Sequence, residues 1–347
     1  MTIETGDEQL GDRLVAAIRG DFPSNPTDKR PVHTYGMGAT GTFRPSSVAA
    51  DYCTAEHFTT EATDVTVRFS NGSGDVGEDD ARPDVHGLAV KFHLASGAET
   101  DMIGMTLPVF FVRDAEEFLA FSHAGVPEPV HAEPWWRKLL DDLRLRRHDP
   151  APPPDGKSGV PGLMHYADRH RFADAGLAAN ATLYAPSSWC RAEYYGVNAF
   201  GVTGADGVRR WVRFQWEPAL GVHPIGPDET FSKDGLRTDL RDRLARGDVQ
   251  FSLRMAIAEA GDAVADPTQA WHLWRRNVVM GTLRVRDLVA DEEQDCEKLS
   301  FNPTRLVPGI ECSADETLAA RRIAYEASCR IRGGTGCPVA TSTGGAA

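Results

Sequence analysis

Hydrophobic residues follow two different periods along this chain. Near the N-terminus, Leu10, Leu14, Val15 and Ile18 fall on one face of a helix, which predicts an amphipathic helix over residues 7–20. Further on, runs that alternate with period two or are rich in strand-forming residues predict strands. These strands are expected over residues 32–44, 64–71, 85–94, 181–186, 193–203, 208–217, 249–260 and 280–287.

Glycines and turn residues refine this strand pattern. Three glycines within residues 32–44 indicate a twisted or bulged strand. The segment Gly204-Ala205-Asp206-Gly207 predicts a hairpin between the two strands that flank it. Residues 149–162 are rich in Pro and Gly, which predicts a loose surface segment. Many strands followed by helices favour an α+β fold built on an antiparallel sheet or barrel.

Several further segments have the composition of helices. One helix is predicted to begin at Asp114, and two more cover residues 134–147 and 235–246. Near the C-terminus, Ser313 followed by Glu316 matches a capping box. The residues after it are rich in Ala, Leu, Arg and Glu, which propagate helices well, so a helix is expected there.

Composition and charge narrow the class of protein. The chain has 347 residues, 41% of them hydrophobic and 25% charged, which is typical of a soluble globular protein. It lacks a run of the roughly 20 apolar residues that a membrane helix needs. The net charge of −13 argues against nucleic acid as a partner. Six cysteines without a CxxC pair predict free thiols, and the acidic N-terminus without an export pattern predicts a cytoplasmic location.

The C-terminal helix carries one pair of residues with chemical potential. Arg321 and Tyr325 are four residues apart, so they lie on one face of the helix. A permanent cation beside a phenol favours the phenolate, and Tyr is one of the axial ligands of haem iron. Taken alone, the pair favours ordinary surface packing or a hydrogen bond, because most Arg/Tyr pairs at this spacing on a helix are of that kind.

A second group of candidate residues lies in the N-terminal part of the chain. His33 follows a proline-rich coil, and Arg68 and Ser70 are two apart on a predicted strand, hence on one face of it. An imidazole holds one tautomer when its other nitrogen has a partner, and Ser70 is a candidate for that role. Arg30 and Arg68 are suited to bind carboxylates as bidentate forks, although surface ion pairs are the simpler alternative.

These segments, in this order, resemble the catalase superfamily. The resemblance covers most of residues 29–333 and is carried by short motifs rather than by one long match. The motifs are Arg30-x-Val32-His33, the Gly-rich strand from Gly36 to Phe43, Val67-Arg68-Phe69-Ser70, Asp84-x-His86-Gly87-x-Ala89-Val90-Lys91-Phe92, Pro108-Val109-Phe110-Phe111-Val112-Arg113-Asp114, Phe301-Asn302-Pro303 through Ile310, and Arg321-x-x-x-Tyr325.

The resemblance implies a fold and a domain organisation. It implies a catalase-like antiparallel β-barrel that encloses haem b, with flanking helices. The length matches the small, catalase-related peroxidases that lack an additional C-terminal domain. We therefore expect an N-terminal helix and arm over residues 1–28, a haem domain over residues 29–335 and a disordered tail over residues 336–347. Small family members also imply a homodimer.

The resemblance further implies roles for individual residues. Tyr325 would be the proximal iron ligand, with Arg321 keeping it as phenolate. His33 would be the distal acid/base, moving a proton from one peroxide oxygen to the other so that water leaves. Ser70 would fix the imidazole. The remaining implied haem contacts are Val32 beside the distal His, Arg30, Arg68 and Arg332 at the propionates, Phe110 against the haem edge or face, and Phe118 on the distal side, where plain core packing is the alternative for both Phe residues.

Several departures from the family pattern bear on the reaction. Met105 stands where the family has a distal Asn, and a thioether donates no hydrogen bond to bound peroxide. Losing one such donor costs about a hundredfold or more in rate. Gln215 and Cys329 stand where the family has His, and His86 where it has Arg. Weak catalase turnover with intact haem binding is therefore expected.

The sequence leaves three functions open. The first is a peroxidase-like oxidoreductase that uses hydrogen peroxide or an organic hydroperoxide, because Met105 makes the distal pocket apolar and suited to an organic substrate. The second is a haem-dependent hydroperoxide isomerase or dehydratase. Rearranging members of the family have Thr before the distal His, and Val32 weakens that version. A haem-binding sensor is third, since it would not explain the pairing of His33 with Ser70.

Overall fold

Antiparallel strands make up the centre of the molecule. The computed structural model describes residues 2–124, 166, 169–226, 229, 231–290 and 294–334. Within these residues the strands are β1 (Gly36–Pro45), β2 (Thr63–Asn71), β3 (His86–His93), β4 (Glu99–Met105), β5 (Tyr194–Tyr195), β6 (Phe200–Thr203), β7 (Arg209–Pro218), β8 (Val249–Ile257), β9 (Asn277–Leu288) and β10 (Ile310–Cys312).

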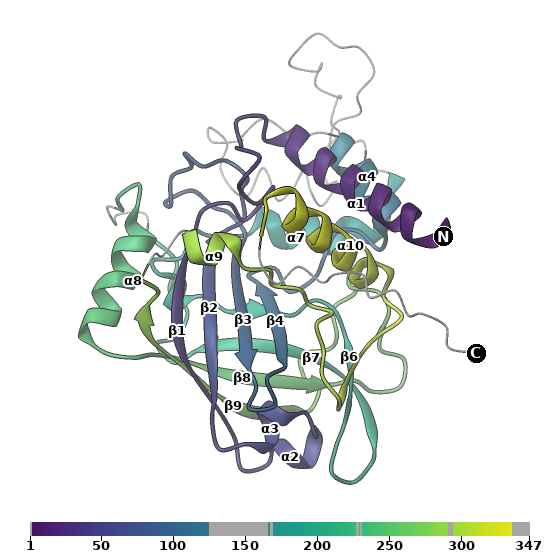
Figure 1. The fold of residues 1–347 in the computed structure, drawn as a ribbon, viewed down its shortest axis with the longest axis vertical. Coiled ribbons are helices and arrows are strands. Elements are labelled where there is room, and N and C mark those ends of the chain that lie inside the picture. Colours follow the sequence, from purple (N-terminus) through teal and green to yellow (C-terminus); the bar gives the residue numbers. More distant parts are fainter. Residues whose placement is uncertain are drawn as a thin grey trace.

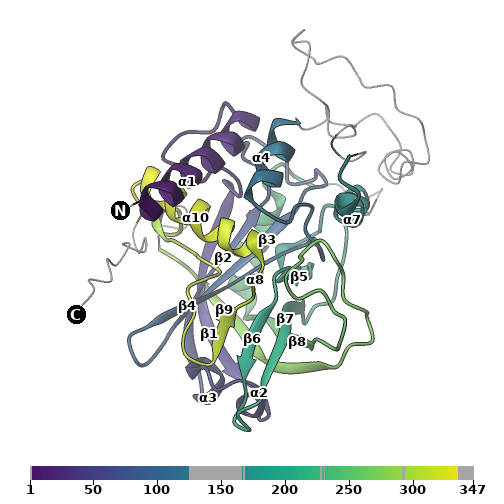
Figure 2. The ribbon, with the colours of Figure 1, turned by 90° about the vertical axis from the view of Figure 1, so that its right-hand side faces the viewer.

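Eight of these strands close into a barrel (Figures 1 and 2). Their order around the barrel is β7-β5-β4-β3-β2-β1-β9-β8, and the pairing of β8 with β7 closes the ring. β6 continues along the edge of β7 that β5 occupies, and β10 pairs with β6. Closure removes the exposed edges that an open sheet would present. The predicted antiparallel barrel with flanking helices is confirmed.

The barrel interior is aromatic. Alternate residues of each strand point inward, as the period of two requires. The ring of Phe43 lies 5.3 Å from that of Phe92 and 6.2 Å from that of Trp216. The register of β1 against β9 shifts between Thr40 and Gly41, which confirms the predicted bulge. A side chain at Gly41 would collide with the backbone carbonyl of Arg284, so only glycine fits there.

Three helices gather at one end of the barrel. They are α1 (Thr2–Asp21), α4 (Ala115–His123) and α10 (Glu316–Ile331), and α1 packs against both of the others. The apolar face of α1 buries Leu14, Val15 and Ile18, as its period predicts. The other helices are α2 (Ala49–Tyr52) and α3 (Glu56–Thr59) at the opposite end, α7 (Asp174–Ala181), α8 (Gly235–Arg246), α9 (Gln294–Lys298) and two single 3₁₀ turns at Arg171–Ala173 and Trp189–Arg191.

Some predictions of local structure were wrong. Residues 181–186 form no strand, because α7 continues to Ala181 and the next amides, Thr182 and Leu183, bond back to its last carbonyls. The strand predicted over residues 193–203 is split into β5 and β6. The capping box is also wrong: the N-cap of α10 is Asp315, whose carboxylate accepts from the Thr317 and Leu318 amides.

Other expectations concern the cysteines and segments that lie outside the described residues. Cys329 is disulfide-bonded, which corrects the prediction of free thiols, while Cys53, Cys190 and Cys312 are free. The partner of Cys329 lies outside the described residues. The predicted helix over residues 134–147, the loose segment 149–162 and the tail 336–347 lie outside them as well. Among the described helices, none combines the length and hydropathy needed to span a bilayer.

Candidate functional site

A cavity lies between the barrel and the helices α1 and α10. The volume of this cavity is ≈ 150 Å³. Its walls come from α1, the segment before β1, strands β2, β3 and β4, and α10. It collects every predicted site residue except Phe110 and Phe118, namely Arg30, Val32, His33, Arg68, Ser70, Met105, Arg321, Tyr325 and Arg332.

His33 is held in an unusual backbone conformation. Its φ is +53°, a left-handed value that residues other than glycine adopt at a cost. Its amide donates to the Gly72 carbonyl at 3.0 Å, and the next amide, from Thr34, donates to the Ser73 carbonyl at 3.2 Å. These bonds fix the direction in which the imidazole leaves the chain.

The imidazole of His33 is paired with Ser70 on β2. The His33 Nδ1 atom lies 3.0 Å from Ser70 Oγ. A Cβ at Gly87, on the neighbouring strand β3, would lie 2.8 Å from Ser70 Oγ and 3.0 Å from His33 Nδ1. Glycine at position 87 therefore leaves the room in which this pair forms. Because Nδ1 is engaged, Nε2 is the ring nitrogen available to a bound molecule.

The surroundings of His33 keep its ring neutral. Burial lowers the pKa of His33 to about 3, and the positive charges of Arg68 and Arg321 add to this effect. His86, also close to His33, is buried, and burial lowers its pKa to about 4. At neutral pH His33 is thus an unprotonated base, partly exposed to the cavity.

On α10 the predicted pair of Arg321 and Tyr325 is present. Arg321 Nη2 donates to Tyr325 Oη at 3.3 Å. The other end of the guanidinium donates from Nη1 to Asn198 Oδ1 at 2.5 Å, and Asn198 Nδ2 donates to Asp315 Oδ2 at 2.7 Å. Since Asp315 also caps α10, this chain of bonds ties the phenol to the start of its own helix.

Asn198 was not among the predicted site residues. It lies between β5 and β6, more than 100 positions before its partners Arg321 and Asp315 in the sequence. No local pattern around it distinguishes it from any other polar residue in a strand region. Gln215, which replaces a family His, is absent from the cavity lining.

Three arginines gather at one edge of the cavity. Arg30, Arg68 and Arg332 all lie around the carboxylate of Glu297, which is 8% exposed. Burial and, after it, the positive charge of the neighbouring Arg30 lower the pKa of Arg68 and of Arg332 to about 9. Glu297 was also missed from the sequence, because it reaches the arginines only through the fold.

Met105 forms part of the cavity wall and connects it to an aromatic cluster. It is the last residue of β4 and pairs with Gly87 and Tyr195. Its side chain packs against a cluster that contains Phe110, Phe111, Phe118 and Phe121. The predicted cavity residues Phe110 and Phe118 belong to this cluster and are not among the residues that line the cavity.

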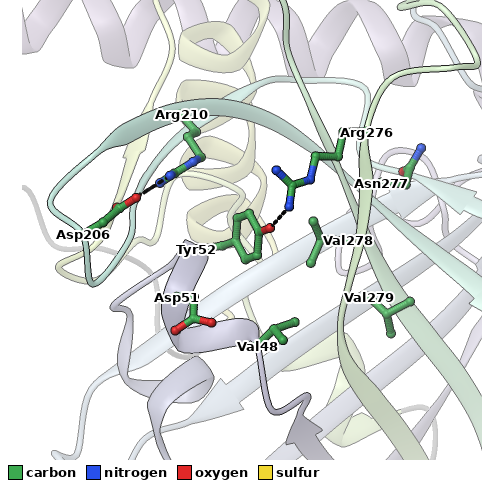
Figure 3. Close-up of a pocket in the computed structure, with 9 residues that line it drawn as sticks. All are labelled: Val48, Asp51, Tyr52, Asp206, Arg210, Arg276, Asn277, Val278 and Val279. Atoms are coloured by element: carbon green, nitrogen blue, oxygen red, sulfur yellow. Dashed lines mark hydrogen bonds and ion pairs between the residues drawn. The ribbon is translucent and has the colours of Figure 1, made fainter.

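A larger depression of ≈ 490 Å³ lies elsewhere, beside α2 and the start of β9 (Figure 3). Its two arginines are already engaged, Arg210 with Asp206 and Arg276 with the hydroxyl of Tyr52. It is open to solvent, and none of its lining residues is a predicted site residue. Size alone therefore does not identify the site, and the smaller cavity carries the chemistry.

The residues of the smaller cavity suit a haem group. Tyr325 with its guanidinium partner is a donor for ferric iron. Leu88, Ala89 and Phe301 supply apolar wall for a macrocycle, and the arginines at the edge supply cations for carboxylates. Fold and site together define a β-barrel of the catalase type, with a cavity whose residues fit a haem group.

Comparison with known proteins agrees with this class. A family model described as Catalase matches residues 4–144 and 176–338. The chain is 30% identical over 325 residues to a catalase-related peroxidase of Mycolicibacterium paratuberculosis, covering 93% of this chain and 95% of that protein. A solved bacterial catalase superposes with a TM-score of 0.71 at 22% identity, covering 91% of this chain and 59% of that one. The chain belongs to the catalase family and is an oxidoreductase.

Several similar catalases are much longer than this chain. The chain is 29% identical to catalase A of Aspergillus fumigatus, with 92% of this chain aligned to 42% of that protein. Against the catalase of Helicobacter pylori it is 28% identical and spans 62% of that protein. The chain therefore matches the catalase-related peroxidase over nearly its whole length and the longer catalases over part of theirs.

Proposed function

We propose that this protein is a haem b peroxidase that acts on hydrogen peroxide or an organic hydroperoxide, with weak catalase turnover. One observation carries the proposal: the His33–Ser70 pair and the Arg321–Tyr325 pair line the same cavity. An acid/base group and an iron ligand in one enclosed space are what peroxide activation requires.

Each residue has a defined task in this proposal. Tyr325 would hold the iron through its phenolate oxygen, and Arg321 would keep that oxygen deprotonated. When bound, the haem supplies the redox chemistry. His33 Nε2 would accept the proton from one peroxide oxygen and return it to the other, so that water leaves from hydrogen peroxide and an alcohol leaves from an organic hydroperoxide. Ser70 keeps the imidazole in one orientation during both transfers.

The side chain of Met105 supports two parts of this proposal, namely the preference for an organic substrate and the low turnover of hydrogen peroxide. Its thioether lacks the donor that would orient a second peroxide molecule, and its side chain continues into the aromatic cluster of Phe110 and Phe111. An apolar wall of this kind favours binding of an organic molecule.

The same apolar wall supports a second candidate, a haem-dependent hydroperoxide isomerase or dehydratase. This reaction needs no external reductant, because the substrate supplies both oxygens and the rearranged product retains them or loses water. A haem-binding sensor is the third candidate and leaves the His33–Ser70 pair without a task.

Rapid mixing of the haem-loaded protein with two oxidants distinguishes these functions. One series uses hydrogen peroxide and the other cumene hydroperoxide, each with and without a phenolic electron donor. Donor-dependent peroxide consumption is expected for the proposed peroxidase. Loss of the organic hydroperoxide at the same rate without a donor would indicate the isomerase. Reversible spectral changes without consumption would indicate a sensor and contradict an enzymatic function.

A further inference from the structure

Glu297 is a buried carboxylate surrounded by arginines. Its Oε1 atom accepts from the Arg30 backbone amide at 2.9 Å, and its Oε2 atom lies 3.0 Å from Arg30 Nη1 and 3.6 Å from Arg68 Nη2. The side chains of Arg30, Arg68 and Glu297 are only 11%, 6% and 10% exposed. All three charges therefore interact in a setting that water screens poorly.

The backbone of α9 and of the residue that follows it, Leu299, also fixes two of the guanidinium groups. Arg30 Nη2 donates to the carbonyls of Cys296 and Leu299 at 2.6 and 2.7 Å. Arg332 donates from Nε to the Glu297 carbonyl and from Nη2 to the Leu299 carbonyl, both at 2.9 Å. The arginines are thus held in two ways, by the carboxylate of Glu297 and by the backbone carbonyls of Glu297 and its neighbours.

The charges in this cluster do not balance. Three guanidinium groups, Arg30, Arg68 and Arg332, face one carboxylate, which leaves a net charge of 3 − 1 = +2. Arg19 lies near Arg332 but is only partly buried and outside the cavity lining, and it donates to the carbonyls of Pro26, Thr27 and Lys29, so its charge is not part of this excess. Burial on its own would raise the pKa of Glu297, but the arginines bring it below its usual value. The carboxylate is therefore ionised, and the excess of positive charge remains.

The arginines retain donors for a further anion. A guanidinium group carries five N–H donors. Within the described part of the chain, Arg68 makes one hydrogen bond, from Nη2 to the Thr34 carbonyl at 3.3 Å, besides its ion pair with Glu297. Since Arg30, Arg68 and Arg332 also line the cavity, an anion in the cavity can reach this edge of it.

We propose that Glu297 assembles the three arginines before the cofactor binds and sets their excess charge so that the site selects a porphyrin with two carboxylates. This inference rests on the proposed haem-binding function. A dianion neutralises the excess, whereas a neutral porphyrin leaves it buried and a tetracarboxylate exceeds it. Glu297 acts through the arginines and is a positioning residue.

The test compares Glu297→Gln with wild type and with the control Glu217→Gln. Glu217 forms a half-exposed ion pair with Arg254 on the outside of the barrel. The control therefore removes one negative charge, as Glu297→Gln does, but at a pair whose two charges cancel and which lies outside the cavity. Each apoprotein is melted alone and then titrated with haem, haem dimethyl ester and iron coproporphyrin, which carry two, zero and four free carboxylates.

Loss of the central carboxylate should destabilise the apoprotein most. We expect Glu297→Gln to lower the Tm of the apoprotein by about 5 °C and that of the haem complex by less than half as much, because the propionates then supply the missing anions. The affinity for haem should rise about tenfold, and the preference for haem over iron coproporphyrin should shrink. The control Glu217→Gln should leave the haem affinity and the preference between the porphyrins unchanged.

Two further outcomes separate the inference from the proposed function. Equal Tm losses in apo and haem-bound protein, with unchanged porphyrin selectivity, would make Glu297 a purely structural residue and overturn the inference. Failure of wild type to bind any of the three porphyrins would instead overturn haem binding itself. Should Glu297→Gln not fold, Arg68→Gln takes its place. This variant reduces the excess charge to one and should shift the preference from haem toward haem monomethyl ester, and an unshifted preference contradicts the inference.

Discussion

Ser70 Oγ lies 3.0 Å from His33 Nδ1, in the space that Gly87 leaves open. The pair joins β2 to a loop residue with a left-handed backbone, and two amide-to-carbonyl bonds hold that backbone in place. The conformation at His33 costs about 1–3 kcal/mol and persists because the surroundings determine it. A strained but well-anchored histidine at a cavity is typical of a residue selected for its orientation.

Replacement of His33 tests the acid/base role directly. His33→Ala should retain haem, because the iron ligand and the arginines are untouched, and should lose about 10²- to 10⁴-fold of the rate of reaction with peroxide. The measurement is the bimolecular rate constant in rapid mixing. His93→Ala is the matched control, since His93 is an exposed histidine at the far end of β3. Unchanged reactivity in His33→Ala would remove the acid/base assignment.

Tyr325→Phe removes only the phenolic oxygen that would bind iron. We expect loss of haem or a grossly altered ferric spectrum, because the Arg321 guanidinium would then face the metal without an anion between them. Absorption spectroscopy of the reconstituted protein measures this. Tyr184→Phe serves as the control, as Tyr184 is 59% exposed and outside the cavity lining. A wild-type spectrum in Tyr325→Phe would show that another residue binds the iron.

Met105→Asn tests whether the missing donor limits disproportionation of hydrogen peroxide. The amide would restore a hydrogen-bond donor at the cavity wall, and a gain of about tenfold or more in oxygen release is expected. Met105→Leu, which matches the volume without a donor, should show no gain. Activity with an organic hydroperoxide should fall in Met105→Asn, because the wall becomes polar. No change in oxygen release would mean that position 105 does not contact peroxide.

His57 predicts how stability depends on pH. It is fully buried between Phe58 and Phe92, with ring centroids at 4.2 and 4.6 Å, and burial lowers its pKa to about 3. In the unfolded chain its pKa is about 6.5, so the unfolded state takes up one proton more as the pH falls below that value. The contribution of neutral His57 to stability is complete above pH ~6.5 and is lost progressively toward pH ~3.

Denaturant unfolding at pH 7, 6 and 5 measures this contribution. Between pH 6 and 5, wild type should lose about 1.2 kcal/mol of unfolding free energy more than His57→Phe. His86, whose pKa burial lowers to about 4, contributes with the same sign and remains in both proteins. Parallel losses in the two proteins would indicate that His57 keeps its ordinary pKa in the fold.

The sequence by itself determined the local elements and the residues with strong chemical character. Period-two alternation located most strands, because a strand with one buried face must alternate whatever its partner is. The i, i+4 spacing placed Arg321 beside Tyr325 for a similarly local reason. Ordered motifs were enough to indicate the barrel, and nearly all of the site residues predicted from them line the cavity.

Only the tertiary structure decided the partners that lie far apart in the chain. Asn198 reaches Arg321 across 123 positions and Glu297 reaches Arg30 across 267, so no local period carries a signal for either contact. The same holds for Asp315, which replaces Ser313 as the cap of α10 while it also binds Asn198. Phe110 and Phe118 have the residue type of a cavity wall, yet the fold packs them in a hydrophobic cluster with Met105 and outside the cavity lining. Residue type and spacing thus determine which side chains are capable of chemistry, and the closing of the barrel determines which of them meet.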